Sequence, residues 1–364
     1  MKIAYFINSM EGGGAQTPLP RIIEALERAG ATVQLFALTR RNGKAIERLQ
    51  ANGVEPVVRE GTERDHLSAL RWMIAQARGS QADIIWTSLT RATLLGQLAG
   101  HNLNVPVVSW QHNAFLKPWN ERLLAWRADA SDLWVADSAQ VARLTRDRLG
   151  IAPENLVTWP IFAADPDVAQ ARPWKPGQTL KLGSLGRLHP AKGYDVLIRA
   201  LATVNEAMAT KPPFSVTIGG IGAQEHELKR RAREAGVEIN FAGFIEEPAS
   251  FLSNLHLYLQ PSRREGFCIA VHEAMQTGLP VIVSDTGEMP FTVNDNSIGI
   301  VVPVEDHEAL AQALIALLGD PQSLSRMGRA ARERVLNRFS TDQFNETAVA
   351  IVERLRTLVQ MRAT

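Results

Sequence analysis

The sequence predicts an α/β fold built from two doubly wound parallel sheets, one in each half of the chain. Short apolar runs alternate with amphipathic helical stretches, which is the pattern of parallel strands covered by helices. This alternation occurs twice, and a proline-rich segment separates the two series. The chain has 364 residues, 45% of them hydrophobic, which is enough for two hydrophobic cores.

Each half is expected to contribute five buried strands to its own sheet. In the first half we expect strands at residues 2–7, 33–38, 83–87, 105–109 and 133–136. In the second half we expect them at residues 180–185, 214–219, 238–241, 255–259 and 280–283. Helical patterns fill the intervals, so both halves have the composition of doubly wound sheets.

The boundary between the halves is predicted from proline spacing. Pro166, Pro173 and Pro176 interrupt helical periodicity in residues 164–178, which we interpret as a linker between domains at 1–163 and 179–340. Residues 341–364 form an amphipathic helix that could pack across both domains. Two facing domains would enclose a cleft, and ligands of open parallel sheets bind beyond the carboxyl ends of the strands.

Composition limits the classes of function and compartment. Lys and Arg number 39 against 38 acidic residues, so no basic excess indicates a nucleic-acid partner. A single cysteine, Cys268, excludes an intrachain disulfide, and the first residues lack the features of a signal peptide. We therefore expect a cytoplasmic protein. Because no apolar run reaches the roughly 18 to 20 residues that span a bilayer, membrane contact is expected to be peripheral, at the inner face of the membrane, if it occurs.

The segment with the most candidate binding residues runs from Leu255 to Asp285, and its pattern predicts a strand, a loop, a helix and a second strand. Gly266 is placed at the expected helix start, where backbone N–H groups and the helix dipole favour a phosphate or sugar oxygens. Glu265 precedes it, and Glu273 follows eight positions later, on the order of 10 Å away along a helix. One carboxylate can face a hexose while the other accepts hydrogen bonds from ribose hydroxyls.

A second segment, from Leu182 to Leu201, runs from a strand through a loop into an amphipathic helix. Arg187 and Lys192 lie in that loop, with Gly193 beside them. Their fixed positive charge suits a diphosphate, whose negative charge grows as it departs. Basic residues near a helix start are also often simply solvated, so local sequence alone does not decide between these roles.

Two features of the first half follow strands. Gly12, Gly13 and Gly14 come after the opening strand, before a helix expected to begin near Pro18. The third glycine of the dinucleotide fingerprint is absent, since Thr17 occupies its place, and no acidic residue ends the second strand; NAD binding is therefore not expected. His112 follows the strand VPVVSW, which places it at a carboxyl strand end.

The motif of two glutamates flanking seven residues, together with PSRREGF before it and EAMQTGLPVIVSDTGEMP after it, resembles glycosyltransferase family 4. The resemblance implies the GT-B fold, two facing Rossmann-like domains, and transfer from a nucleotide-activated sugar with retained configuration. It implies that Arg187 and Lys192 bind the diphosphate, that Gly13 and Gly14 contact donor phosphate or acceptor, and that His112 lies near the sugar.

The same resemblance implies further donor contacts. The FAGFIEE segment is similar to the family loop whose backbone receives the nucleobase, which makes Ile245 the expected contact. The donor-binding set also includes Gly266, Phe267, Cys268, Ile269 and Glu273, while His112, Arg187, Lys192 and Glu265 form the expected catalytic set. Glu288 could face the cleft or serve as a helix N-terminal carboxylate, and the sequence does not separate these roles.

The expected reaction moves a hexose from a UDP- or GDP-sugar to a hydroxyl of a saccharide or lipid-linked glycan. The resemblance also implies a same-face mechanism in which the diphosphate takes the acceptor proton, and an acceptor such as a lipid-linked oligosaccharide, lipopolysaccharide or other bacterial cell-surface polysaccharide. An epimerase of related fold, a dinucleotide-dependent oxidoreductase and a non-catalytic nucleotide-binding protein remain alternatives.

No cofactor and no metal are expected beyond the donor itself. Asp165, Pro166 and Asp167 form a D-x-D string, but it lies in the predicted linker, and no His or Cys spacing is typical of a metal site. Trp110, Trp119 and Trp126, with Lys117, Arg122 and Arg127, could form a surface that touches lipid headgroups. A core-facing aromatic helix is the favoured interpretation of that segment.

Overall fold

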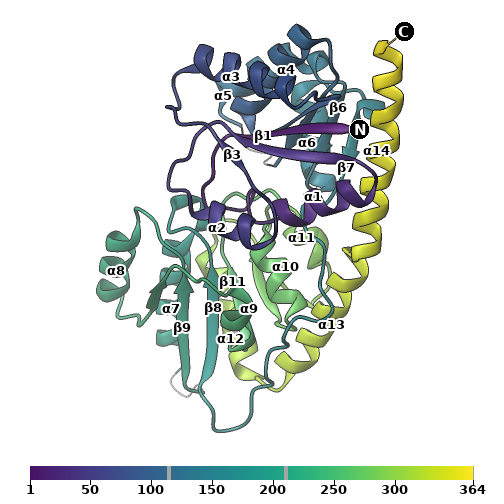
Figure 1. Ribbon diagram of the computed structural model, residues 1–364. Helices are drawn as coiled ribbons and strands as arrows, with labels where there is room; N and C mark the ends of the chain where they lie inside the picture. Colours follow the sequence, from purple (N-terminus) through teal and green to yellow (C-terminus); the bar gives the residue numbers. More distant parts are fainter. Residues whose placement is uncertain (113–115, 209–211, 364) are drawn as a thin grey trace. The chain divides into compact units, whose positions relative to one another are not determined.

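The structure is a computed structural model that describes residues 1–112, 116–208 and 212–363. The chain divides into two compact units, one of residues 1–162 and 341–364, the other of residues 163–340. Both are α/β units with parallel sheets (Figure 1). Asn113, next to the predicted site residue His112, lies outside the described residues.

The described part of the N-terminal unit contains a seven-stranded parallel sheet of order β3-β2-β1-β4-β5-β6-β7. Its strands are β1 (Lys2–Ile7), β2 (Thr32–Ala37), β3 (Val57–Val58), β4 (Ile84–Ser88), β5 (Val107–Gln111), β6 (Leu133–Ala136) and β7 (Leu156–Thr158). The five predicted strands are present, shifted by up to two residues. Strands β3 and β7 were not predicted, because they have only two and three residues and are too short to show a period.

Helices cover the sheet of the N-terminal unit. They are α1 (Leu19–Arg28), α2 (Lys44–Ala51), α3 (His66–Gly79), α4 (Thr90–Leu103), α5 (Pro118–Trp126), α6 (Ala139–Leu149) and α14 (Thr341–Ala363). Helix α3 packs on α4 and α5 packs on α6, whereas α1 packs on the C-terminal helix α14. The indole Nε1 of Trp159 donates to the carbonyl of Phe344 at 3.1 Å. Helix α14 is therefore an integral part of this unit, although 178 residues of the other unit precede it.

The C-terminal unit has a parallel sheet of order β10-β9-β8-β11-β12-β13 in its described residues. The strands are β8 (Leu180–Leu185), β9 (Phe214–Gly219), β10 (Asn240–Gly243), β11 (Leu257–Gln260), β12 (Val281–Ser284) and β13 (Gly299–Val302). The helices are α7 (Tyr194–Ala207), α8 (Glu225–Glu234), α9 (Pro248–Ser253), α10 (Ile269–Gln276), α11 (Met289–Thr292), α12 (His307–Gly319) and α13 (Ser323–Arg338). Strand β13 was not predicted; the others were.

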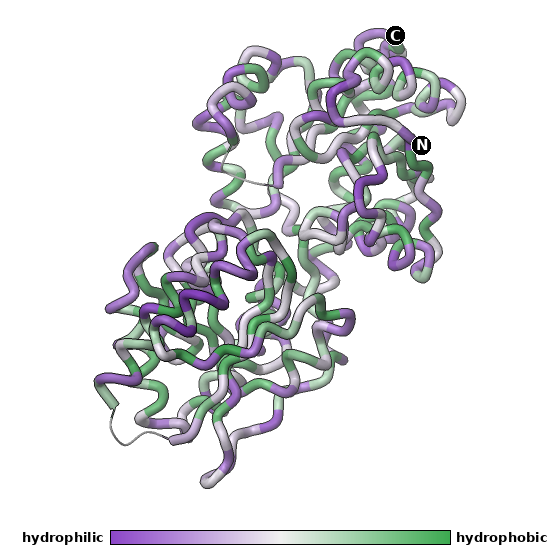
Figure 2. Tube along the Cα trace, turned by 90° about the vertical axis from the view of Figure 1, so that its left-hand side faces the viewer, coloured by the Kyte–Doolittle hydropathy of each residue, from purple (hydrophilic) through white to green (hydrophobic). Residues whose placement is uncertain are grey.

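Each unit has its own hydrophobic core. In the C-terminal unit, buried strand residues such as Leu182 and Ile218 pack against Leu197 and Leu314 of α7 and α12. In the N-terminal unit, Phe6 and Phe36 stack with ring centroids 4.9 Å apart. Along the outer helices, hydrophilic and hydrophobic residues alternate within short stretches (Figure 2), as expected where one side of a helix is buried.

The strand order determines where a ligand site can form. In each sheet the chain builds strands in one direction, then returns to the other side of the first strand: between β1 and β4 in one unit, and between β8 and β11 in the other. The carboxyl edge beside such a strand pair is the usual ligand site of open α/β sheets. The predicted glycine-rich loop follows β1, the loop with Arg187 and Lys192 follows β8, and the loop with Glu265 follows β11.

Candidate functional site

The carboxyl ends of β8 and β11 bring two separately predicted motifs into contact. Lys192 ends the short 3-10 helix Pro190–Lys192 in the loop after β8, and Glu265 lies in the loop after β11. Lys192 Nζ donates to Glu265 Oε1 at 2.6 Å, although the residues are 73 positions apart. Their side chains are 19% and 10% exposed. The structure thus places a paired cation and anion at the point where the strand order reverses.

The pair has further polar neighbours, and they affect the charge of Lys192. Glu265 Oε1 also accepts a hydrogen bond from Ser262 Oγ at 2.6 Å and lies 3.5 Å from Gln260 Nε2. Burial lowers the pKa of Lys192, but the Glu265 carboxylate together with other neighbouring acidic groups raises it more, so the net pKa lies above that of a free lysine. Lys192 is therefore a permanent positive charge near neutral pH.

Glycine allows the two loops to approach this closely. Gly193 has φ +66°, and a Cβ there would lie 1.9 Å from the carbonyl oxygen of Pro261. A Cβ on Gly220, which has φ +140°, would lie 1.9 Å from the carbonyl oxygen of Gly186. No side chain fits at such distances, and positive φ favours glycine at both positions. These glycines let the backbones of adjacent loops touch at the strand ends.

Arg263 connects the loop after β11 to the segment after β8, and it was not among the predicted site residues. Its guanidinium binds both carboxylate oxygens of Asp195 at 2.7 Å and the carbonyl oxygen of Pro190 at 2.7 Å, and it also pairs with Glu305. Its backbone N–H donates to the carbonyl of Ala191 at 2.8 Å. Such a bidentate pair has a fixed geometry, so Arg263 positions the segment that carries Lys192.

The helix after Glu265 begins later than predicted. Helix α10 starts at Ile269, so Gly266 lies in the loop and not at the helix start. The reason is Cys268, which caps α10 in the left-handed conformation with φ +63° and ends the irregular part of the loop. Because only the second half of the motif is helical, the distance estimated for a continuous helix does not apply to Glu265 and Glu273.

The other residues of this segment have distinct environments. Phe267 is buried and stacks on His272 at 4.0 Å between ring centroids, so its side chain is not available to a ligand. Cys268 is also buried, and burial raises the pKa of its thiol well above the ordinary value. Ile269 and Glu273 are half-buried on α10. Glu273 therefore keeps an accessible part, as a ligand-binding carboxylate requires.

Arg187 and Ile245 flank the same strand ends. Arg187 is exposed in the loop after β8 and forms no ion pair with any residue that the structure describes. Ile245 follows β10, and a Cβ on Gly219 would lie 2.5 Å from its Cγ1 atom. The Ile245 side chain thus packs over the end of β9, next to the loop that carries Arg187.

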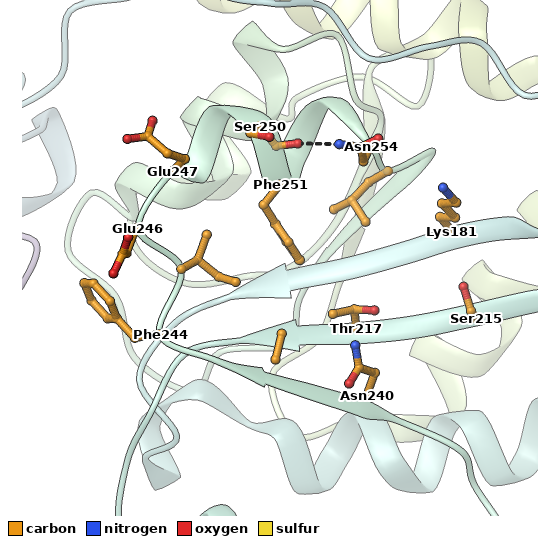
Figure 3. A pocket seen from close by; sticks show the side chains of 13 residues that line it. Lys181, Ser215, Thr217, Asn240, Phe244, Glu246, Glu247, Ser250, Phe251 and Asn254 are labelled. Atoms are coloured by element: carbon orange, nitrogen blue, oxygen red, sulfur yellow. Dashed lines mark hydrogen bonds between the residues drawn. The ribbon is translucent and has the colours of Figure 1, made fainter.

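An open cavity of about 700 Å³ lies on the α9 side of this sheet (Figure 3). Lys181, Ser215, Thr217 and Asn240 line it from the strands, and Phe251 extends toward it from α9. Of the predicted site residues only Ile245 borders this cavity. The Lys192–Glu265 pair lies elsewhere, and it follows the strand ends where ligands of this fold class bind, so we place the candidate site there and not in the cavity.

Glu288 is buried and has a structural partner. It forms an ion pair with Arg338 of α13, and its backbone N–H donates to the carbonyl of Gly266 at 2.9 Å. It also occupies the cap position of α11. The structure thus favours the helix-terminal role over an exposed position, and the loop after β12 supports the backbone of Gly266.

His272 lies inside the motif and is fully buried in its neutral form. Its ring nitrogens contact the carbonyl of Cys268 and the hydroxyl of Thr292, each at 3.0 Å. Burial lowers the pKa of His272 to about 3. The unfolded chain binds a proton at this residue below about pH 6.5, so the stability that the neutral ring provides is complete above that pH and declines as the pH falls toward 3.

We expect a measurable pH effect from His272. Between pH 7.5 and 5 the wild-type chain should lose about 2 kcal/mol of folding free energy through this residue, since each pH unit below 6.5 costs about 1.4 kcal/mol. In His272→Gln this part of the loss should be absent. Chemical denaturation of both chains at the two pH values tests the difference, and an equal pH-dependent loss in both would contradict it.

In the N-terminal unit, His112 belongs to a buried hydrogen-bond network that includes residues of β1, β4 and β5 and of the loop after β6. Its Nδ1 atom lies 2.9 Å from Asp137 Oδ1, and its Nε2 atom lies 3.0 Å from Ser88 Oγ. Ser88 Oγ lies 2.6 Å from the hydroxyl of Tyr5, and Trp110 Nε1 donates to Asp137 at 2.6 Å. The Asp137 carboxylate accepts from Nδ1–H, which leaves Nε2 as the acceptor of the Ser88 hydroxyl in the neutral ring.

The glycine-rich loop after β1 is a compact turn. The carbonyl of Gly13 accepts hydrogen bonds from the backbone N–H groups of Gln16 and Thr17 at 3.1 and 3.0 Å. Gly14 is exposed, and nothing lies within 4 Å of a Cβ placed on it. Helix α1 follows with Pro18 as its cap, as expected. The exposed backbone of Gly14 is thus open to a ligand, whereas Gly13 stabilises the turn.

The D-x-D string, metal-ligand clusters and membrane-spanning helices can be checked against the structure. The backbone N–H of Asp167 donates to the carboxylate of Asp165 at 2.9 Å, so the D-x-D string forms a local turn. Within the described ranges no group of three or more His, Cys, Asp or Glu side chains is placed to hold a metal ion. Nor does any helix in those ranges have the length and apolar character needed to cross a membrane.

The favoured interpretation of the tryptophan segment is wrong for two of its three tryptophans. Trp110 is fully buried, as expected for a core residue, but Trp119 and Trp126 of α5 are exposed. Arg127 is half-buried and donates from Nε to Gln97. The helix is short and buries its other side, so apolar composition alone does not show which residues face the core.

Topology could have predicted part of what the sequence analysis missed. Ser88 ends β4, and Asp137 directly follows β6. Both strands were predicted, and parallel strands end at a common edge, so polar residues at these ends could have been grouped with His112. Tyr5 lies within β1 and gave no such signal. The tertiary pairing of Arg263 with Asp195 also has no signature in the sequence.

Solved structures of other proteins have the same architecture as this chain. HepE from Anabaena in complex with UDP and glucose has a TM-score of 0.84 and 21% identity over 98% of this chain and 100% of that one. Sucrose-phosphate synthase from Thermosynechococcus elongatus has a TM-score of 0.78 and 19% identity over 99% of this chain and 100% of that one. The fold is that of the GT-B glycosyltransferases.

Two family models match the sequence. Glycosyl transferases group 1 matches residues 169–334, and Glycosyltransferase Family 4 matches residues 12–162. One model thus falls within each structural unit, and together they leave only the two ends and a short central segment unmatched. The chain belongs to this family of glycosyltransferases.

Named relatives share up to a third of the aligned residues. Phosphatidyl-myo-inositol mannosyltransferase from Mycolicibacterium smegmatis is 29% identical over 89% of this chain and 86% of that protein. A GDP-mannose-dependent monoacylated phosphatidylinositol monomannoside mannosyltransferase from Corynebacterium glutamicum is 32% identical over 46% of this chain and 45% of that protein. The chain therefore aligns with most of the first relative, but with less than half of the second.

Proposed function

We propose that this glycosyltransferase transfers mannose from GDP-mannose to a hydroxyl of a saccharide or lipid-linked glycan, with retained configuration. The observation that carries the proposal is the Lys192–Glu265 pair, which puts a permanent cation and a carboxylate at the switch point of the C-terminal sheet. The names of the relatives, several of them mannosyltransferases, support mannose as the sugar. The structural likeness to HepE shows a common fold only, so it gives no reason to prefer a UDP-sugar as the donor of this chain.

The proposed chemistry uses the leaving diphosphate as the base. The acceptor oxygen forms a bond to the anomeric carbon as the bond from that carbon to the phosphate oxygen breaks, on the same face of the sugar. The phosphate oxygen takes the acceptor proton. Lys192 and Arg187 stabilise the growing charge on the diphosphate, while Glu265 orients Lys192 and accepts hydrogen bonds from the sugar. No protein nucleophile is required.

In this proposal Glu273 binds the ribose of the donor. It is half-buried on α10, about one turn beyond the loop that holds Glu265. In Glu273→Ala the loss of one charge-assisted hydrogen bond should weaken GDP-mannose binding about tenfold, with little change in thermal stability. Isothermal titration calorimetry measures the affinity.

The matched control is Glu308→Ala, because Glu308 is an exposed glutamate on α12 of the same unit. Its affinity for GDP-mannose should equal that of the wild type. Unchanged affinity in Glu273→Ala would contradict the ribose assignment.

A panel of GDP-mannose, UDP-glucose and ADP-glucose tests the donor. GDP-mannose should give the largest thermal stabilisation, because a ligand bound to the folded state raises its melting temperature. A larger shift with a UDP-sugar would overturn the mannosyl proposal but leave the site assignment intact. Consumption of the donor without any acceptor, with formation of an isomeric sugar nucleotide, would instead indicate an epimerase.

A further inference from the structure

Helix α5 of the N-terminal unit exposes two tryptophans to solvent. Trp119 is 67% exposed and Trp126 is 78% exposed, whereas Trp86, Trp110 and Trp134 of the same unit are fully buried. Exposed aromatic side chains that gather on one surface are characteristic of interaction sites, not of an isolated monomer surface. Neither tryptophan has a role in the donor site described above.

The two tryptophans lie on one side of the helix. At about 100° per residue, Trp119 and Trp126 differ by about 20° in direction, and Arg122 lies within about 60° of both. Leu124 points to the opposite side, where it is fully buried and packs with Trp134 and Leu149. The helix thus already has a satisfied buried side, and we call the side that carries Trp119, Arg122 and Trp126 the tryptophan face.

The charges of α5 are divided between its two sides. Glu121 is the helix's acidic residue; it points away from the tryptophan face and lies 3.6 Å from Arg148. Arg122 is exposed on the tryptophan face, and exposed Lys117 precedes the helix. Neither forms an ion pair with another residue in the described part of the chain. The tryptophan face is therefore aromatic and cationic, without an opposing carboxylate of its own helix.

We propose that the tryptophan face binds the surface of a membrane that contains anionic phospholipids. Tryptophan rings partition to the headgroup region, where one end of the ring is apolar and the other can donate a hydrogen bond. Arg122 and Lys117 have long apolar stems, which can lie among the headgroups while the charges meet phosphate groups. The aromatic rings of the tryptophan face thus match the headgroup region of such a membrane, and its positive charges match the lipid phosphates.

A second copy of the chain is a poorer occupant of this face. A twofold contact would bring Arg122 of one copy next to Arg122 of the other, between the tryptophans, and would leave both charges without partners. The inference rests on exposure and charge alone, so it holds whichever sugar the enzyme transfers. It also accounts for how an enzyme without a spanning helix among its described residues could meet a lipid-linked acceptor.

Vesicle flotation with the full chain tests the proposal. The wild type should bind vesicles of equal parts phosphatidylglycerol and phosphatidylcholine, and bind vesicles of phosphatidylcholine alone more weakly. The double variant W119S and W126S should reduce the partition coefficient about tenfold or more. Arg122→Gln should reduce binding to the anionic vesicles only, and should make the remaining binding less sensitive to salt.

The matched control is Leu67→Ser, because Leu67 is 75% exposed on α3 of the same unit. It should bind vesicles as the wild type does. GDP-mannose affinity, or that of whichever donor the wild type binds, should remain unchanged in every variant, which separates this test from that of the proposed function.

Two results would overturn the proposal. One is wild-type flotation that is absent or equal to that of the double variant. The other is a wild-type dimer in solution that the double variant converts to a monomer, because that result would assign the tryptophan face to a second copy.

Discussion

Replacement of Lys192 by alanine should lower kcat by about 10²–10³-fold, the usual cost of removing one preorganised charge from the developing negative charge of a transition state. Lys192 is held 2.6 Å from Glu265 and is largely buried, so water cannot easily substitute for its ammonium group. GDP release in the presence of acceptor measures the rate. Donor affinity should change less than kcat, because the charge on the diphosphate grows only as the bond to the sugar breaks.

Two further variants define what the Lys192 result means. Lys192→Arg should recover part of the rate, because the positive charge remains although its geometry differs. Lys175→Ala removes an exposed lysine from the segment before β8 and should leave kcat unchanged. A folded Lys192→Ala protein with wild-type kcat would remove Lys192 from the reaction.

Substitution of Gly193 by alanine should destabilise the C-terminal unit by at least about 3 kcal/mol. A left-handed residue other than glycine costs about 1 kcal/mol by itself, and here the added Cβ would also lie 1.9 Å from the carbonyl oxygen of Pro261. Because that oxygen belongs to the loop that carries Glu265, the clash should also separate Lys192 from its partner. The melting temperature and kcat of Gly193→Ala should therefore both be lower than those of the wild type.

Gly236 provides the matched control for Gly193. It has φ +64° at the end of α8, close to the +66° of Gly193, and nothing lies within 4 Å of a Cβ placed there. Gly236→Ala should cost only about 1 kcal/mol and leave kcat unchanged. The difference between the two variants isolates the contact between loops, and equal losses would show that this contact does not matter.

The fold was predictable where apolar runs were long enough to show a period. All strands of four or more residues were expected except β13 (Gly299–Val302), whose sequence GIVV offers few residues to read. Strands β3 and β7 are shorter still and depend on their neighbours for pairing. The late start of α10 depends on the left-handed backbone of Cys268, a conformation that its residue type does not favour.

The site was predictable only as separate motifs. Lys192 and Glu265 were each expected to bind the donor, but their direct contact required the strand order of the folded sheet. Asp137 and Ser88 hold His112 through tertiary hydrogen bonds, and no local pattern marks such pairs. Trp119 and Trp126 were assigned to the core because aromatic residues usually lie there; their exposure follows from which side of α5 is buried, namely that of Leu124.

We propose that the loops after β8 and β11 form the donor site. Hydrogen–deuterium exchange of the full chain with and without GDP-mannose tests this proposal, because it reports protection amide by amide. We expect slower exchange in residues 186–193 and 261–273 when the donor is bound. Protection confined to residues 8–18, after β1, with no change in those two loops, would contradict it.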